Sequence, residues 1–139
     1  MPPERCNLGM KKKIGILLIV LMAAGAAMAA QSNSHVPQDV FDAMRRGFDA
    51  ERAKGVHARY QFDLSGPNGG LWWIEVDDAK CRMGRGRIQS PGVTFIATDE
   101  DWVGLSNGTL HGWWAYLSGR LKIHGDQNLA RKLNEMFND

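Results

Sequence analysis

The stretch Val56-His-Ala-Arg-Tyr-Gln-Phe-Asp-Leu64 alternates between apolar and polar side chains along its whole length. A period of two is typical of a β-strand that buries one face and exposes the other. We therefore expect the apolar set to face a core and the polar set to face water. The apolar set is Val56, Ala58, Tyr60, Phe62 and Leu64, and the polar set is His57, Arg59, Gln61 and Asp63. This pattern requires a sheet that is covered on one face.

Three more strands are predicted directly after this one, over 71–77, 80–87 and 93–98. Turn signals separate them, such as the Gly- and Pro-rich segment 65–70 and the pair Pro91-Gly92. Trp72, Ile74 and Val76 share one face of the second strand. Because the four strands are consecutive and their connections are short, an antiparallel meander is the simplest pairing.

Helical spacing is found on both sides of these strands. An apolar stripe that begins at Val40 predicts a helix over 37–54. After the fourth strand, Thr98 and the acidic residues that follow it predict a helix start, and a short aromatic helix is expected over 110–117. A fifth strand over 119–124 and a last helix after Asp126 follow. The predicted fold class is α+β, with a five-stranded, mostly antiparallel sheet and helices packed on one face.

The N-terminal part of the chain has the layout of a secretory signal peptide. Three lysines at 11–13 precede an apolar run, and Ala27-Met-Ala29 supplies small residues at a cleavage site. We predict an upstream extension over 1–9, a signal peptide over 10–29 cleaved after Ala29, a flexible tether over 30–36 and one domain over 37–139. The protein is then exported to the periplasm or the extracellular medium. Membrane anchoring by an uncleaved signal is the alternative, because the alanines lengthen the apolar run towards the ~20 residues of a spanning helix.

The predicted mature segment is nearly neutral. From Gln31 onward there are 13 Lys plus Arg against 14 Asp plus Glu, a net charge of −1, so no nucleic-acid partner is indicated. Cleavage would remove Cys6 and leave Cys81 as a single cysteine, which cannot form an internal disulfide. We expect Cys81 to be a buried, inert thiol, because the side chains of Lys80 and Arg82 point to the opposite face of the strand.

Four segments of the chain, taken in order, form a family pattern. They are Trp72-Trp-Ile-Glu-Val76, Pro91-Gly-Val-Thr-Phe-Ile-Ala-Thr98 with the acids that follow it, Gly108-Thr-Leu110, and Ala115-Tyr-Leu-Ser-Gly-Arg-Leu-Lys-Ile-His-Gly-Asp126. Their order and spacing resemble the sterol carrier protein type 2 family, and the first predicted helix fits as well. The chain departs from the family in its predicted export, since members are mostly intracellular or fused to enzymes. Acyl-CoA is therefore not an expected ligand.

The resemblance implies an apolar tunnel between the sheet and the helices that binds a lipid or fatty-acid-like ligand. It implies no catalytic activity, no cofactor and no metal. The expected function is lipid binding and transfer by a monomer, with transient membrane contact and a partner enzyme as further associations. The predicted ligand-binding residues are bulky apolar side chains: Phe95, Trp102, Leu105, Trp113, Trp114, Tyr116, Leu117, Leu133 and Phe137.

A tightly packed core is the alternative for any one of these side chains. Trp113 and Trp114 are a special case, because adjacent residues on a helix point about 100° apart. Both cannot easily belong to a core, so one of them is expected at a cavity or at a surface that lipids approach.

Other functions find less support in the sequence. The four histidines (His35, His57, His111 and His124) have no partner at a metal-ligand spacing, and no G-x-S-x-G nucleophile motif is present. A basic cluster is either a solvated strand edge or a site for anionic lipid headgroups; it consists of Lys80, Arg82, Arg85 and Arg87. Three classes remain: a lipid carrier, an accessory domain that holds apolar substrate for a partner enzyme, and a small hydrolase or redox protein. The missing catalytic motifs disfavour the last class.

Overall fold

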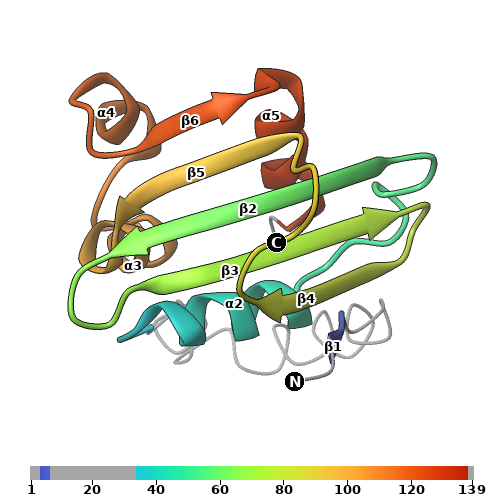
Figure 1. The fold of residues 1–139 in the computed structure, drawn as a ribbon, viewed down its shortest axis with the longest axis horizontal. Helices are drawn as coiled ribbons and strands as arrows, with labels where there is room; N and C mark the ends of the chain where they lie inside the picture. The colour runs from blue at the N-terminus through green and yellow to red at the C-terminus, as the bar shows by residue number, and fades with distance from the viewer. Residues whose placement is uncertain (1–3, 7–33, 138–139) are drawn as a thin grey trace, which may run out of the picture.

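The computed structural model describes residues 4–6 and 34–137, and in this part of the chain one sheet is covered by helices (Figure 1). The helices are α2 (Pro37–Arg46), α3 (Asp99–Asn107), α4 (Gly112–Leu117) and α5 (Gln127–Met136). The strands are β1 (Glu4–Arg5), β2 (His57–Ser65), β3 (Gly70–Asp77), β4 (Cys81–Arg85), β5 (Val93–Thr98) and β6 (Lys122–Gly125). The predicted α+β class is confirmed. The predicted signal peptide lies outside the described residues.

The strand order differs from the predicted meander. The sheet runs β1-β4-β3-β2-β5-β6, and β5 pairs with β2 in parallel, with Phe62 opposite Phe95. The prediction of four antiparallel strands in a row was therefore wrong for the fourth one. The connection after β4 crosses the sheet on the face opposite the helices and carries the chain to the far side of β2 (Figure 1).

Gln61 explains how this crossing is held. Its amide nitrogen donates to the carbonyl oxygens of Trp72 (3.0 Å) and Gly86 (2.9 Å), and its amide oxygen accepts from the backbone N–H of Ile88 (2.9 Å). Gln61 is only 3% exposed, so the prediction that it faces water was wrong. The polar face of β2 is dry at this position because the crossover covers it.

The inner face of the sheet holds the aromatic core. The predicted apolar side chains of β2 and β3 are all buried, and Tyr60 and Phe62 are fully inaccessible. Phe62 contacts the rings of Phe41, Phe95 and Trp102 at centroid distances of 5.0, 5.2 and 5.1 Å. Such aromatic pairs add stability beyond the area they bury. This cluster joins α2, β2, β5 and α3 into one unit.

Helix α2 ends earlier than predicted, at Arg46 rather than at residue 54. The backbone N–H of Gly47 closes the last turn, and the side chain of Asp49 then accepts from the backbone N–H groups of Glu51 and Arg52. Phe48 is buried as the apolar spacing suggests, but it reaches the core from the irregular segment after the helix. Glycine at the end of a helix is a common stop.

The N-terminal residues 4–6 are attached to the domain. β1 pairs with the edge of β4, and Cys6 forms a disulfide with Cys81. Cys81 is buried, as predicted. The prediction that it is a free thiol is wrong for a chain that keeps residues 4–6, because that prediction assumed that Cys6 had been removed.

The predicted basic cluster is partly used inside the domain. Arg82 forms an ion pair with Glu75, and the guanidinium of Arg85 lies 4.1 Å from the ring centroid of Trp72. Lys80 and Arg87 are exposed. Two of the four cations are therefore engaged with neighbouring side chains, which weakens the case for a shared headgroup site on β4.

Glu75 gives the domain a pH-dependent stability. Arg82 first, and then Arg59, lower the pKa of this carboxyl from its ordinary 4.5. A lowered pKa in the folded state stabilises the fold at all pH values above 4.5, and the contribution is lost as the pH falls below that value. We expect Glu75→Gln to cost about 1 kcal/mol at neutral pH, since both arginines are half exposed.

The measurement is urea unfolding of both proteins over a pH series. The difference in free energy of unfolding between wild type and Glu75→Gln should disappear in acid. Glu51→Gln is the control, because Glu51 and its partner Lys54 are both largely exposed; it should change stability little. A difference between wild type and Glu75→Gln that stays constant into acid contradicts the assignment.

Candidate ligand pocket

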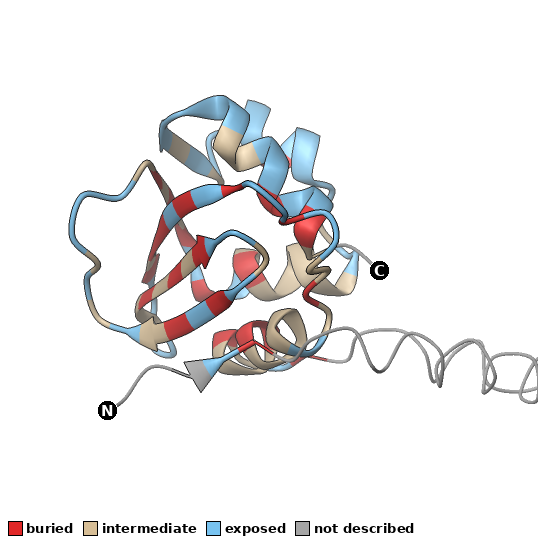
Figure 2. Ribbon diagram, turned by 90° about the vertical axis from the view of Figure 1, so that its right-hand side faces the viewer, coloured by how far each residue is buried: buried red, intermediate tan, exposed pale blue. Residues whose placement is uncertain are grey.

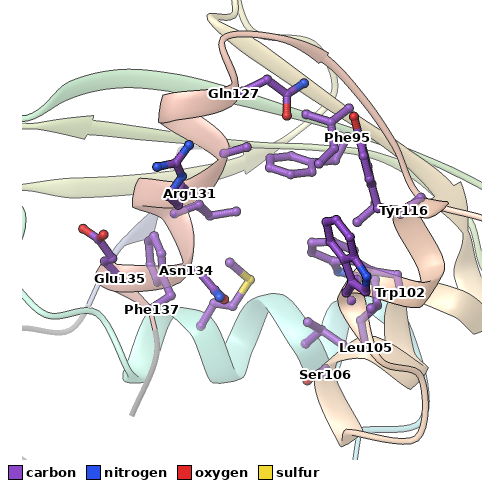
Figure 3. A pocket seen from close by; sticks show the side chains of 18 of the residues that line it. Phe95, Trp102, Leu105, Ser106, Tyr116, Gln127, Arg131, Asn134, Glu135 and Phe137 are labelled. Carbon is purple, nitrogen blue, oxygen red and sulfur yellow. The ribbon is translucent and has the colours of Figure 1, made fainter.

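A pocket of about 960 Å³ lies between the inner face of the sheet and the helices (Figure 3). Its walls come from α2, α3, α4 and α5, and its floor includes Phe95 of β5 and Ile123 of β6. Protein interiors are otherwise close-packed, with few voids larger than one water molecule. A space of this size is at the upper end of the range for small-molecule sites.

Two local features hold the wall formed by α5. The hydroxyl of Tyr60 donates to the carbonyl oxygen of Leu129 at 2.9 Å, and burial raises the pKa of this hydroxyl well above its usual range. The backbone N–H of Asp126 donates to the carbonyl oxygen of Gly92 at 2.9 Å, and its side chain caps α5 at Asn128. The Gly-Asp step before α5 thus fixes where this helix begins.

Gly125 itself is required by close approach. Its φ is +113°, and an added Cβ would collide with the backbone at Gly92. Only glycine adopts this conformation at low cost. Its place in the quoted family pattern therefore has a steric reason: it lets β6 pair closely with β5.

The two sides of the pocket differ in chemistry. Trp102 and Tyr116 stand on one side, on α3 and α4 (Figure 3). On the other side, α5 presents polar and charged side chains: Gln127, Arg131, Asn134 and Glu135. Arg52 also lines the pocket and pairs with Asp49 at 3.5 Å. An apolar wall facing a wall with a few polar groups suits an amphiphilic molecule, in which a hydrocarbon part and a polar part must both be satisfied.

Seven of the nine predicted ligand-binding residues line this pocket: Phe95, Trp102, Leu105, Trp113, Tyr116, Leu133 and Phe137. Trp114 and Leu117 do not line it, and they are 59% and 58% exposed. Whether any of the nine binds a ligand stays a prediction. The tunnel also stays a prediction, since what the described residues form is an open pocket.

The prediction missed two groups of lining residues. Val40, Ala43 and Met44 belong to the apolar stripe of α2, so the helical pattern could have suggested them. The polar residues of α5 could not have been found in this way, because a charged side chain on an amphipathic helix ordinarily indicates only the solvated face.

The described residues contain no cluster of side chains arranged for metal binding. All four histidines are exposed, and His57 contacts Asp77 at 2.7 Å through Nδ1. No group of His, Cys, Asp or Glu among the described residues is placed to hold a metal ion. Within the same residues, no helix is both long enough and apolar enough to cross a membrane.

The fold and the pocket together define a class of protein: a small α+β domain with an amphiphilic cavity beneath its helices. The chain matches the SCP-2 sterol transfer family over residues 41–138. It belongs to this family, and the predicted resemblance is confirmed.

Curated relatives share this domain as one part of a longer protein. Hydroxysteroid dehydrogenase-like protein 2 of Xenopus laevis is 31% identical over 115 residues, which are 82% of this chain and 28% of that protein. The protein of the same name from Mus musculus is 33% identical over 102 residues, which are 72% of this chain and 21% of that protein. This chain therefore spans about a quarter of the length of these relatives.

Solved structures show the same fold at lower identity. Palmitated SCP2L2 from Aedes aegypti has a TM-score of 0.59 and 21% identity, with 76% of this chain and 96% of that chain covered. The sec-alkylsulfatase Pisa1 from Pseudomonas sp. has a TM-score of 0.65 and 15% identity, with 74% of this chain and 16% of that chain covered. The fold thus occurs both as a separate small protein and within a large enzyme.

Proposed function

We propose that this protein binds a lipid in the pocket between its sheet and its helices, and that it carries or presents this lipid without chemistry of its own. The observation that carries the proposal is a pocket of about 960 Å³ in a domain of the SCP-2 sterol transfer family. Seven bulky apolar side chains that the sequence suggests for binding line this pocket. The palmitated state of one structural neighbour, SCP2L2 from Aedes aegypti, supports a fatty-acid-like ligand.

The chemistry of the walls supports an amphiphile with one chain. An apolar chain against Phe95, Trp102 and Leu133 would be removed from water, which is worth ~25 cal/mol per Å² of buried apolar surface. A polar head on the α5 side would meet Gln127 and Arg131. Because Arg131 is exposed, a polar head beside it would stay partly hydrated. The free-energy cost of removing water from the head on binding would therefore be small.

Native mass spectrometry of the purified protein tests this proposal directly. We expect a fraction of the protein to carry one co-purified lipid, or one palmitate after incubation with that acid. Ala130→Phe should reduce this adduct, because Ala130 lines the pocket and a phenyl ring there would fill it. Ala50→Phe is the matched control, since Ala50 packs against the core but does not line the pocket. Bare protein before and after incubation would contradict lipid binding.

A second candidate function is an accessory role beside an enzyme. The matched part is 28% of a relative named as dehydrogenase-like and 16% of an alkylsulfatase, so this kind of domain accompanies larger catalytic chains. We propose that the domain could present apolar substrate to such a partner. Addition of the domain would then raise kcat/KM of the partner enzyme for long-chain substrates and leave short, water-soluble ones unchanged. Equal rates with and without the domain would contradict this role.

We also propose that the protein is exported and cleaved after Ala29. The basic and apolar pattern over 10–29 supports this proposal. Cleavage there removes Cys6, so the mature protein would hold Cys81 as a free thiol that is alkylated once the protein is unfolded, whereas the uncleaved chain keeps the disulfide. N-terminal sequencing and intact mass after alkylation separate the two forms. An N-terminus upstream of residue 23, with no alkylated cysteine, would indicate an uncleaved signal.

A further inference from the structure

Helix α4 exposes its large apolar side chains and buries its small one. Trp113, Trp114 and Leu117 are 65%, 59% and 58% exposed, whereas Ala115 is fully buried. All other residues of 111–120 are exposed as well, and the top of the molecule, where α4 lies, is drawn mostly pale blue (Figure 2). An amphipathic helix in a globular domain shows the opposite arrangement. A contiguous apolar patch on a surface indicates a partner.

Two exposed cations lie beside this patch. From residue 102 to residue 125 the sequence contains no Asp or Glu, and Arg120 and Lys122 are exposed beside α4. Neither of them forms an ion pair within the described residues. In the neighbouring strand β5, the residue opposite Lys122 is the uncharged Ile96.

Along the chain, this segment is flanked by Asp126, which follows β6, and by the three acids in the first turn of α3. The side chain of Asp126 accepts from the backbone N–H of Asn128 at the start of α5. The acids of α3 lie at the end of that helix that is remote from its connection to α4. The charge next to the aromatic side chains is therefore cationic, with nothing acidic on β5 or α4 to cancel it.

The patch is continuous with the pocket. Trp113 and Tyr116 line the pocket and are also exposed to solvent, and Tyr116 stands at its edge in the close view (Figure 3). Trp114 and Leu117 belong to the exposed side alone. An apolar ligand that passes between α4 and the pocket would therefore remain against aromatic side chains.

We propose that α4 docks on the surface of an anionic phospholipid bilayer, with Trp113, Trp114 and Leu117 in the interfacial layer and Arg120 and Lys122 against the headgroups. This inference rests on the proposed function, because docking matters for a domain that exchanges a lipid with the membrane. Tryptophan and tyrosine favour the membrane–water interface, and cations near an anionic leaflet are attracted to it. A second copy of the chain fits this surface less well, since a two-fold contact would bring the same cations together.

Vesicle co-sedimentation of the purified protein tests the docking. We expect binding to phosphatidylcholine vesicles that contain phosphatidylserine, and weaker binding to phosphatidylcholine alone. The double variant Trp114→Ala with Leu117→Ser should lower the partition coefficient at least about tenfold on both kinds of vesicle. Arg120→Gln with Lys122→Gln should lower it about 30-fold on the anionic vesicles alone.

Two controls give the test its specificity. Lys80→Gln with Arg87→Gln removes two exposed cations from β4 and the connection that follows it, and vesicle binding should not change. Palmitate titration of the Trp114→Ala, Leu117→Ser variant should match wild type, because neither residue lines the pocket. A failure of the proposed function would appear as no palmitate binding by wild type and is therefore distinct from a failure of docking.

Wild-type vesicle binding by the Trp114→Ala, Leu117→Ser variant would overturn the proposal. So would a concentration-dependent dimer in sedimentation velocity that the same variant abolishes, because a second copy would then occupy the surface. Loss of binding in the Lys80→Gln, Arg87→Gln variant, with the α4 variants unaffected, would move the membrane contact to β4.

Discussion

Replacement of Gln61 by leucine is expected to cost about 2–4 kcal/mol of the free energy of unfolding. The amide of Gln61 satisfies three backbone groups, at Trp72, Gly86 and Ile88, over distances of 2.9 to 3.0 Å. Leucine has a similar size but cannot donate or accept a hydrogen bond. Each backbone group left unpaired in a buried place costs about 1–3 kcal/mol, and the carbonyl oxygen of Gly86 can recover part of this cost by reaching water.

The loss would be a large share of the ~5–15 kcal/mol that stabilises a typical domain. Urea unfolding measures it directly, and a lower melting temperature should accompany it. Gln89→Leu is the matched control, because Gln89 lies in the same crossover but is exposed; surface changes of this kind usually stay within about 0.5 kcal/mol. Equal stability of Gln61→Leu and wild type would mean that the crossover is held by other contacts.

The same residue shows what the sequence could not reveal about the sheet. Alternation along 56–64 predicts correctly which side chains of β2 face the core. The same alternation predicts that Gln61 faces water, because a buried amide and a solvated amide give the same alternation of apolar and polar residues in the sequence. The burial of Gln61 depends on the crossover over 86–92, and the crossover depends on where β5 pairs.

The pairing of β5 with β2 depends on contacts between residues that are far apart in the sequence. Short connections favour neighbouring antiparallel strands, but the link between β4 and β5 is long enough to pass over two strands. Once β5 lies beside β2, Phe95 stacks on Phe62 at 5.2 Å, and the family resemblance is the only sequence feature that could have suggested a fold with this order.

The candidate site was partly predictable for a related reason. Aromatic residues concentrated between 95 and 117 point to the apolar wall, because so many bulky side chains in short helices exceed what a small core needs. The polar wall could not be predicted, because it depends on how α5 lies against the sheet, which Tyr60 and Gly125 determine. The outward orientation of Trp114 and Leu117 could not be predicted either, because the sequence does not show that Ala115 is the residue of α4 that packs inward.

Phe62→Ala is expected to lose ~3–5 kcal/mol, the range for truncating a buried aromatic residue in a packed core. Phe62 is fully inaccessible and touches three other rings. Trp113→Ala should behave differently, because a side chain that is 65% exposed contributes little to folding. Thermal and urea unfolding of both variants should therefore separate a core aromatic from a pocket aromatic.

The most direct test of the lipid pocket is a fluorescent fatty-acid titration of wild type, Trp113→Ala and Trp114→Ala, with displacement by unlabelled palmitate. The two tryptophans are neighbours on one short helix and are similarly exposed, but only Trp113 lines the pocket. We predict saturable, displaceable binding by wild type and by Trp114→Ala, and about tenfold weaker binding by Trp113→Ala as apolar contact is lost. Binding that rises linearly without saturation, or an equal loss in both variants, would contradict a ligand held in this pocket.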